Sequence, residues 1–262
     1  MIKAKKSLGQ NFLIDQNIIN KIINIINIKN KNVLEIGPGT GNLTLEILKK
    51  NPKKVILIEK DTKLANMLIK KFTDNVNVIN QDVLKINENI LCDQSLIVFG
   101  NLPYNISTEI LSKWILNLDQ NKSWFNYLIL MFQKEVADRI ISKFNTKDYG
   151  RLSILANWRL NIKKIFDVKA TSFQPKPKVE STVLFFEPKK NYFKFKNPKN
   201  LEKITRIFFM HRRKMIKKPY KQLFNDNENI ASKMGIDLNL RPQNLNLETY
   251  YELTEKYENL RS

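Results

Sequence analysis

Five short apolar runs, most of them followed by a stretch of helix length, constrain the fold of this chain more than any other feature. The runs cover residues 33–36, 55–58, 76–79, 96–99 and 127–132. Helical patterns cover residues 16–28, 42–50, 62–72, 107–116 and 133–143. Parallel neighbouring strands need long crossover connections, which are usually helices. The alternation therefore predicts an α/β fold with a doubly wound, mainly parallel sheet that helices cover on both faces.

The pattern changes in the last third of the chain. Residues 179–186 alternate partly in hydrophobicity and follow a proline-stiffened loop, which predicts a strand that closes the sheet as an antiparallel edge. Beyond Pro188 the composition becomes basic and helical. We therefore predict one domain over residues 1–188 and a small helical domain over residues 189–262.

The charge of the chain indicates the kind of partner. Lys and Arg outnumber Asp and Glu by 45 to 25, which gives a formal net charge of +20. Such an excess favours a polyanion, with nucleic acid as the first interpretation and an anionic membrane surface as the second. Solvated lysines on helix faces explain part of the excess.

Several classes of protein are excluded by what the sequence lacks. One cysteine, Cys92, and one histidine, His211, leave no disulfide framework and too few soft ligands for a zinc site. No apolar run reaches the length of about 18 residues that a transmembrane helix needs. The basic start at residues 1–6 has no apolar signal core. We therefore expect a cytoplasmic protein without a metal.

Polar residues follow four successive strands of the predicted sheet. The glycine-rich turn with Gly37 and Gly39 follows the first strand, Glu59 ends the second, Asp82 follows the third and Asn101 follows the fourth. Open α/β sheets bind ligands in the crevice at the carboxyl ends of their strands. The sequence therefore predicts that these side chains meet at one cofactor site.

Two cofactor classes are open to a glycine turn of this kind. An acid at the position of Glu59 can accept hydrogen bonds from ribose hydroxyls, and Asp82 can accept one from an adenine amino group. A nicotinamide enzyme also needs a pyrophosphate site and a hydride partner, which the sequence does not supply. S-adenosylmethionine has no phosphate and carries an already activated methyl group, so this cofactor is favoured.

The turn Asn101-Leu102-Pro103-Tyr104 follows the fourth strand and can hold a planar amine. The Asn101 side-chain oxygen and the Pro103 carbonyl can accept its two N–H bonds, while the Tyr104 ring stacks on the attached base. This holds the nitrogen lone pair out of conjugation and makes the amine nucleophilic. Four such residues alone are also typical of an ordinary turn at a strand end.

Together these motifs resemble the ribosomal RNA adenine N6,N6-dimethyltransferases, whose domain is a Rossmann-like class I methyltransferase. The matching segments are residues 8–13, 33–41, 99–108, 133–136, 149–153, 173–181 and 212–214. The resemblance implies that S-adenosylmethionine is the cofactor. The cofactor contacts that it implies are Asn11, Leu13, Gly37, Glu59, Asp82 and Asn101, with Gln10 and Gly39 as neighbours.

The resemblance also implies the reaction and the RNA. The enzyme would dimethylate the N6 amino groups of two adjacent adenosines in the 3′-terminal hairpin of 16S rRNA, in a partly assembled small subunit. Asn101, Pro103 and Tyr104 would be catalytic, and Phe173 would stack on the second face of the base, although a core role is more typical of such a residue. Phosphate contacts are expected from Arg206, His211, Arg212, Arg213, Lys214, Lys217, Lys218 and Lys221.

Other functions stay open at this point. A related methyltransferase of large-subunit rRNA would share the sheet and the catalytic turn. A binding factor in ribosome assembly could keep the same fold with chemistry secondary. We take a monomer as the starting expectation. No carboxylate base is required, because the methylated product is an ammonium that loses its proton readily.

Overall fold

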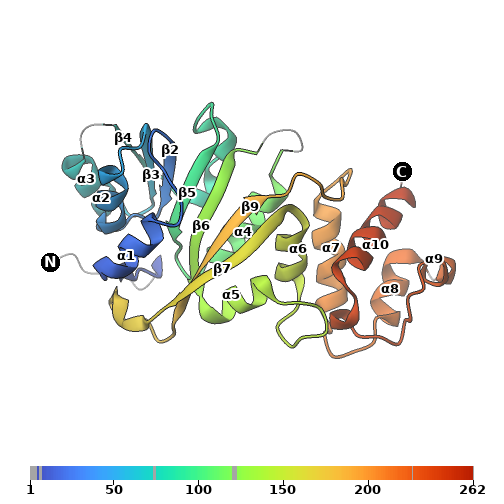
Figure 1. Cartoon of the computed structure of the whole chain (residues 1–262). Coiled ribbons are helices and arrows are strands. Elements are labelled where there is room, and N and C mark those ends of the chain that lie inside the picture. Colours follow the sequence, from blue (N-terminus) through green and yellow to red (C-terminus); the bar gives the residue numbers. More distant parts are fainter. Residues whose placement is uncertain (1–4, 6–7, 73–74, 120–122, 226, 262) are drawn as a thin grey trace. The chain divides into compact units, whose positions relative to one another are not determined.

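The structure is a computed structural model that describes residues 5, 8–72, 75–119, 123–225 and 227–261 (Figure 1). Of the basic start at residues 1–6, only Lys5 belongs to this part. The chain divides into two compact units, residues 1–137 with 161–188 and residues 138–160 with 189–262.

The first unit contains a seven-stranded sheet in the order β4-β3-β2-β5-β6-β9-β7 (Figure 1). The five parallel strands are those predicted from the apolar runs: β2 (Asn32–Ile36), β3 (Lys54–Glu59), β4 (Val76–Asn80), β5 (Leu96–Asn101) and β6 (Phe125–Gln133). Every residue of β2 is buried, and β3 is buried beyond its first residue. Strands covered on both faces read as continuous apolar runs, which is why the sequence revealed them.

The far side of the sheet differs from the prediction. The predicted antiparallel strand is β9 (Ser181–Pro188), and it does pair antiparallel with β6. It is not the edge, because β7 (Leu160–Val168) lies beyond it. The exposed, lysine-containing middle of β7 is typical of an edge strand and carries no regular alternation, so the sequence pattern did not reveal it.

In the described part of the first unit the sheet is accompanied by α1 (Gln16–Ile23), α2 (Asn42–Lys49), α3 (Thr62–Lys71) and α4 (Ser107–Leu116), while α5 (Lys134–Ile141) begins in the first unit and ends in the second. Right-handed crossovers place α2 and α3 on one face and α4 on the other, as Figure 1 shows for α2 and α4. Asp15 begins α1, because its Oδ1 accepts hydrogen bonds from the backbone N–H groups of Asn17 and Ile18 at 3.0 and 3.3 Å. The helix ends at Ile23, earlier than the predicted residue 28.

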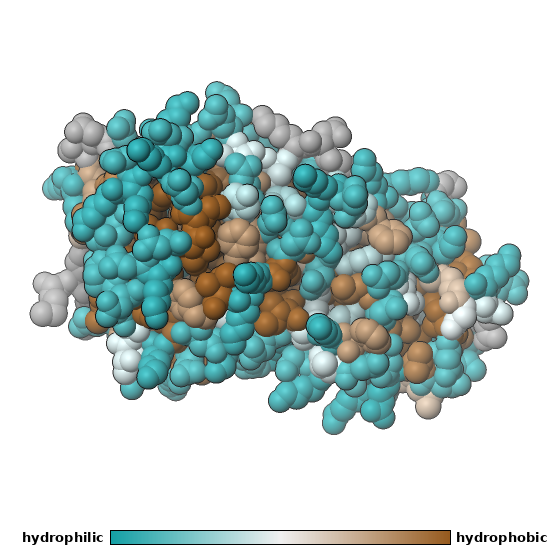
Figure 2. Space-filling view, in the orientation of Figure 1, coloured by the Kyte–Doolittle hydropathy of each residue, from teal (hydrophilic) through white to brown (hydrophobic). Residues whose placement is uncertain are grey.

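Short elements complete the first unit. They are a two-stranded sheet of β1 (Phe12–Leu13) and β8 (Phe173–Gln174), and the 3₁₀ turns η2 (Val83–Lys85), η3 (Glu88–Ile90) and η4 (Ala170–Ser172). Figure 2 shows apolar side chains gathered beside α1, over β6 and its neighbours. On these strands the rings of Tyr127 and Phe185 lie 5.2 Å apart.

The second unit is helical: α6 (Arg151–Arg159), α7 (Lys199–Phe209), α8 (Lys217–Phe224), α9 (Glu228–Lys233) and α10 (Leu247–Asn259), with the turn η5 (Pro242–Asn244). Its residues 138–160 had been assigned to the first domain by the sequence. They group with the C-terminal helices because α6 is bonded into them. The Tyr251 hydroxyl donates to the carbonyl of Ile154 at 3.1 Å, and the Trp158 indole donates to that of Phe193 at 2.7 Å.

None of the helices in the described part of the chain combines the length and apolar character that crossing a membrane requires. The prediction of an α/β fold with a mainly parallel sheet and a small helical part is confirmed.

Candidate active site

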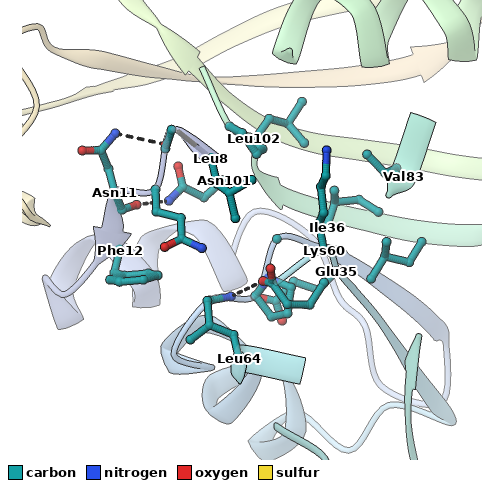
Figure 3. Close-up of a pocket in the computed structure, with 18 of the residues that line it drawn as sticks. Leu8, Asn11, Phe12, Glu35, Ile36, Lys60, Leu64, Val83, Asn101 and Leu102 are labelled. Atoms are coloured by element: carbon teal, nitrogen blue, oxygen red, sulfur yellow. Dashed lines mark hydrogen bonds between the residues drawn. The ribbon is translucent and has the colours of Figure 1, made fainter. Parts of the chain in front are cut away.

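A cavity in the first unit opens at the carboxyl ends of β2, β3, β4 and β5 (Figure 3). Its walls include residues 8–13, 35–40, 81–83 and 101–106, together with the end of β3 and the start of α2. All eight residues predicted to contact the cofactor line this cavity, as do Pro103 and Tyr104. The structure therefore brings these side chains together, as expected where parallel strands end at one edge of a sheet.

The glycine turn brings its backbone close to an aromatic ring. Gly37 and Gly39 have φ angles of 66° and 58°, in the left-handed region that favours glycine. A Cβ atom at Gly39 would lie 2.7 Å from Cδ1 of Phe12, which is closer than such atoms can pack. The Gly37 N–H donates to the carbonyl of Ile58 at 3.0 Å and ties the turn to β3. At Gly37 and Gly39 the turn therefore presents backbone to the cavity.

Glu59 is held rigidly at the end of β3. Its Oε1 accepts the backbone N–H of Asp61 at 2.8 Å, and its Oε2 accepts that of Gly39 at 3.2 Å. The residue is 6% exposed, and burial raises the pKa of its carboxyl group. Each oxygen has a second lone pair, so both can accept a ribose hydroxyl without moving.

Asp82 is a second acidic residue in the wall of the cavity. Its Oδ2 lies 2.7 Å from Nζ of Lys60, and its Oδ1 accepts the Leu84 N–H at 3.0 Å. The hydrogen bond from Lys60 holds the pKa of the Asp82 carboxyl below its usual value. Among the described residues that line the cavity, Lys60 is the one Lys or Arg, and Figure 3 shows it on the same side as Glu35 and Val83.

The Asn101 side chain is oriented by the amino-terminal segment. Its Nδ2 donates to the backbone carbonyl of Asn11 at 2.8 Å (Figure 3). This bond turns Oδ1 away from Asn11 and leaves it as an acceptor. The Pro103 carbonyl accepts the Ile106 N–H at 3.1 Å and keeps one lone pair. The Tyr104 hydroxyl lies 2.6 Å from Oγ of Ser181.

The sequence missed other residues that shape the cavity. Glu35, inside β2, is 2% exposed, accepts the Thr44 hydroxyl at 2.6 Å, and has its pKa raised by burial to about 7. It is the one acid within an otherwise apolar run, a signal that could have identified it. Asp61 holds Nζ of Lys5 at 2.7 Å and the amide of Gln10 at 3.4 Å, which fixes the segment over the cavity.

Phe173 lies outside the cavity. It is 3% exposed, pairs with Leu13 across β1 and β8, and belongs to the apolar core. The structure does not bring it to the other predicted catalytic residues, because its ring fills the core beneath the amino-terminal segment. Phe173 does not line the cavity, so its position does not support the predicted stacking on a base.

The predicted phosphate contacts lie in the second unit. Arg206, His211, Arg213, Lys214, Lys217 and Lys218 are exposed. Arg212 is half-buried and has protein partners: its Nε donates to Oε1 of Gln243 at 3.1 Å, and one terminal nitrogen donates to the carbonyl of Thr146 at 3.3 Å. Lys221 is also half-buried. Six of the eight are therefore open to solvent, and Arg212 connects two loops.

Comparison with known proteins gives consistent results. A family model described as ribosomal RNA adenine dimethylase matches residues 1–259. The ribosomal RNA small subunit methyltransferase A of Pelagibacter ubique (strain HTCC1062) is 62% identical over 260 residues, which is 99% of each chain. That of Wolbachia sp. subsp. Drosophila simulans (strain wRi) is 39% identical over 98% of this chain and 95% of its own.

Solved structures agree with the fold. A dimethyladenosine transferase from Plasmodium falciparum has a TM-score of 0.76 at 27% identity, over 95% of this chain and 98% of its own. The 23S rRNA methyltransferase ErmE has a TM-score of 0.68 at 23% identity, over 95% of this chain and 100% of its own. At that identity the second similarity shows a shared fold and nothing more.

Proposed function

This chain belongs to the ribosomal RNA adenine dimethylase family, and we propose that it uses S-adenosylmethionine to dimethylate adenine N6 amino groups in small-subunit rRNA. The observation that carries the proposal is the position of Asn101, Pro103 and Tyr104 in the wall of an acidic cavity. In that wall, two acceptors for an amine and a ring that can stack on the attached base lie next to a cofactor site.

The cavity fits S-adenosylmethionine chemically. Glu59 offers two fixed oxygens for ribose hydroxyls, and Asp82 offers an acceptor for the adenine amino group. The absence of a Cβ at Gly39 lets the ring of Phe12, which also lines the cavity, pack against the turn. Carboxylates suit a cofactor that has hydroxyl and amino groups, carries a positive charge and has no phosphate. Bound there, S-adenosylmethionine would supply a methyl group that is already activated on sulfur.

The residues of the turn then prepare the amine. The Oδ1 of Asn101 and the Pro103 carbonyl accept its N–H bonds, so the lone pair of the nitrogen is directed out of the base plane. Tyr104 stacks on the base and holds it at reacting distance. In the second transfer the monomethyl amine has one N–H left, so after rotation it donates to one of these two acceptors.

The proposed substrate is the pair of adjacent adenosines in the 3′-terminal hairpin of 16S rRNA, in a partly assembled small subunit. Each base has to leave its stack, which costs a few kcal/mol unless the loop already exposes it. The exposed basic residues of the second unit supply contacts to phosphates. We further infer that the enzyme acts as a monomer in the cytoplasm, where ribosomes assemble.

The test compares three RNA substrates. Purified protein and labelled S-adenosylmethionine would be incubated with unmethylated small-subunit particles, naked 16S rRNA and naked 23S rRNA, and the modified bases would be located. We expect dimethyladenosine at two adjacent positions of 16S rRNA. Modification of 23S rRNA alone would support the large-subunit alternative. Failure to bind S-adenosylmethionine or its demethylated product at millimolar concentration would overturn the cofactor assignment.

A further inference from the structure

A buried serine from a distant strand anchors the ring of Tyr104. The Tyr104 hydroxyl and Oγ of Ser181 are 2.6 Å apart, although 77 residues separate them in sequence. Ser181 is fully buried, whereas Tyr104 is half-buried and lines the cavity. The contact therefore joins a buried hydroxyl in the sheet to a side chain that lines the cavity.

Ser181 is fixed because it begins β9. It lies opposite Gln133 in the antiparallel ladder with β6, and the carbonyl of Glu180 accepts the Lys134 N–H at 3.0 Å. The Lys134 side chain also pairs with that of Glu180, with Nζ and Oε2 3.1 Å apart. The position of the serine is therefore set by the sheet and does not depend on the loop that carries Tyr104.

Different bonds hold the main chain and the ring of Tyr104. Its turn is closed by backbone and side-chain bonds, from Ile106 N–H to the Pro103 carbonyl at 3.1 Å and from the Ser107 hydroxyl to the Tyr104 carbonyl at 3.3 Å. These bonds set the main chain and do not involve the phenol ring. The hydrogen bond at the far end of the phenol fixes the position of its oxygen, and with it the direction of the ring axis.

We propose that Ser181 is a positioning residue that fixes the position of the Tyr104 ring for stacking on the target adenine. This inference rests on the function proposed above. A ring held in one orientation keeps the base, and with it the amine, in line for transfer, and small errors of placement lower rates strongly. Ser181 itself touches neither base nor cofactor in this scheme.

The first experiment measures steady-state methylation of 16S rRNA by Ser181→Ala. We expect kcat to fall about three- to tenfold, the effect of losing one hydrogen bond. The KM for RNA and the affinity for the demethylated cofactor should change less than about twofold, because phosphate contacts and the cofactor walls are untouched. A general loss of structure would change all three quantities.

The second experiment is a double-mutant cycle with Tyr104→Phe, which keeps the stacking ring and removes the hydroxyl. Each single variant should lower kcat by a similar factor, and the double variant should lower it no further. Thr182→Val is the matched control, because Thr182 is the next residue on β9, is fully buried and donates its hydroxyl to Asp167 at 2.6 Å, away from the cavity. The control should keep the kcat of the wild type.

The outcomes separate this inference from the proposed function. An active wild type with an unchanged Ser181→Ala, or with additive losses in the double variant, would overturn the inference alone. A wild type that methylates no adenine would overturn the proposed function, and the inference with it. If Ser181→Ala does not fold, Tyr104→Phe tests the inference by itself. A kcat of Tyr104→Phe equal to that of the wild type would show that the hydrogen bond to Ser181 is dispensable.

Discussion

Asn101 depends on a backbone group for its orientation. Its amide donates to the carbonyl of Asn11, so a side-chain change at Asn11 leaves this bond in place. The carbonyl is fixed by the segment around it, which Lys5 and Gln10 attach to Asp61. The acceptor that faces the substrate is therefore set before any ligand binds, a condition for electrostatic stabilisation at little cost in reorganisation.

Replacing Asn101 by Ala should separate chemistry from cofactor binding. We expect methyl transfer to fall at least 100-fold, the order seen when one such polar group is removed from an active site. Affinity for the demethylated cofactor should change much less. Tritium transfer to RNA measures the first quantity and calorimetry the second. Equal losses in both would assign Asn101 to the cofactor and not to the amine.

Glu35 makes the stability of the protein depend on pH. Burial raises its pKa from 4.5 to about 7, so between these values the folded protein binds more protons at this site than the unfolded chain. Stability contributed here is therefore lost as the pH rises through that window. Glu35→Gln, which can still accept the Thr44 hydroxyl, should gain stability relative to the wild type at pH 8 compared with pH 5.

Urea unfolding of both proteins at the two pH values measures this difference. Glu109→Gln, an exposed position on α4, serves as the control and should follow the wild type. A stability difference between Glu35→Gln and wild type that is the same at pH 5 and pH 8 would contradict the raised pKa.

Some of these residues are predictable from the sequence and others are not. Glu59, Asp82 and Asn101 were placed correctly at the cavity because parallel strands end at one edge. The contact of Tyr104 with Ser181 could not be predicted, because it depends on the register of β6 and β9. The same holds for the carbonyl of Asn11, since a backbone group has no signature in the sequence.

Strands and helices were predictable to different degrees. The buried parallel strands were visible because both faces are apolar, whereas β7 was not, since an edge strand carries lysines and lacks regular alternation. The stretch that forms α6 gave no helical pattern, because six of its nine residues, 153–156, 158 and 159, are buried, and between them only Asn157 is half-exposed. A helix that is buried all round has no polar face to reveal its period.

The segment from η2 to η3 is supported by α4. Nζ of Lys113 donates to the carbonyl of Val83 at 3.0 Å and to Oε1 of Glu88 at 2.6 Å. Glu88 is 4% exposed and also accepts the indole N–H of Trp114 at 2.7 Å. Since Asp82 begins this segment, the lysine holds the wall of the cavity in place.

Lys113→Met should therefore weaken both the fold and the cofactor site. We expect the free energy of unfolding to fall by on the order of 2 kcal/mol, because a buried carboxylate loses its partner, and cofactor affinity to fall several-fold. Chemical unfolding and calorimetry measure the two effects.

Lys49→Met provides the control for this prediction. Lys49 pairs with Glu46 on α2 at 2.7 Å but is largely exposed, so its loss should change stability by less than about 1 kcal/mol. A stability loss in Lys113→Met no larger than that of the control would show that the buried network does not support the segment.

Charge is distributed over the whole chain, but its roles differ by place. In the first unit the Lys60 charge is paired with Asp82 at the cavity, and that of Lys5 with Asp61. In the second unit Arg213, Lys214, Lys217 and Lys218 follow the end of α7 and are exposed. The net charge of +20 predicts a polyanionic partner. It does not distinguish a cation that is bonded within the protein, such as Arg212, from one that is open to phosphate.

This difference gives a prediction for RNA binding. Neutralising one phosphate contact lowers the slope of log affinity against log salt by about 1. We expect Arg213→Ala to lower the slope by that amount, since Arg213 is exposed. Arg212→Ala should instead lower the melting temperature, because its bonds to Gln243 and Thr146 connect two loops.

Binding of 16S rRNA would be measured between about 50 and 200 mM salt, the range over which phosphate contacts change affinity strongly. Lys53→Ala is the control, because Lys53 precedes β3 at the amino ends of the strands, the opposite edge of the sheet from the cavity. It should keep the slope of the wild type. An unchanged slope in Arg213→Ala would exclude this residue from the RNA interface. A reduced slope in Arg212→Ala without loss of stability would support the phosphate contact that the sequence predicts for Arg212.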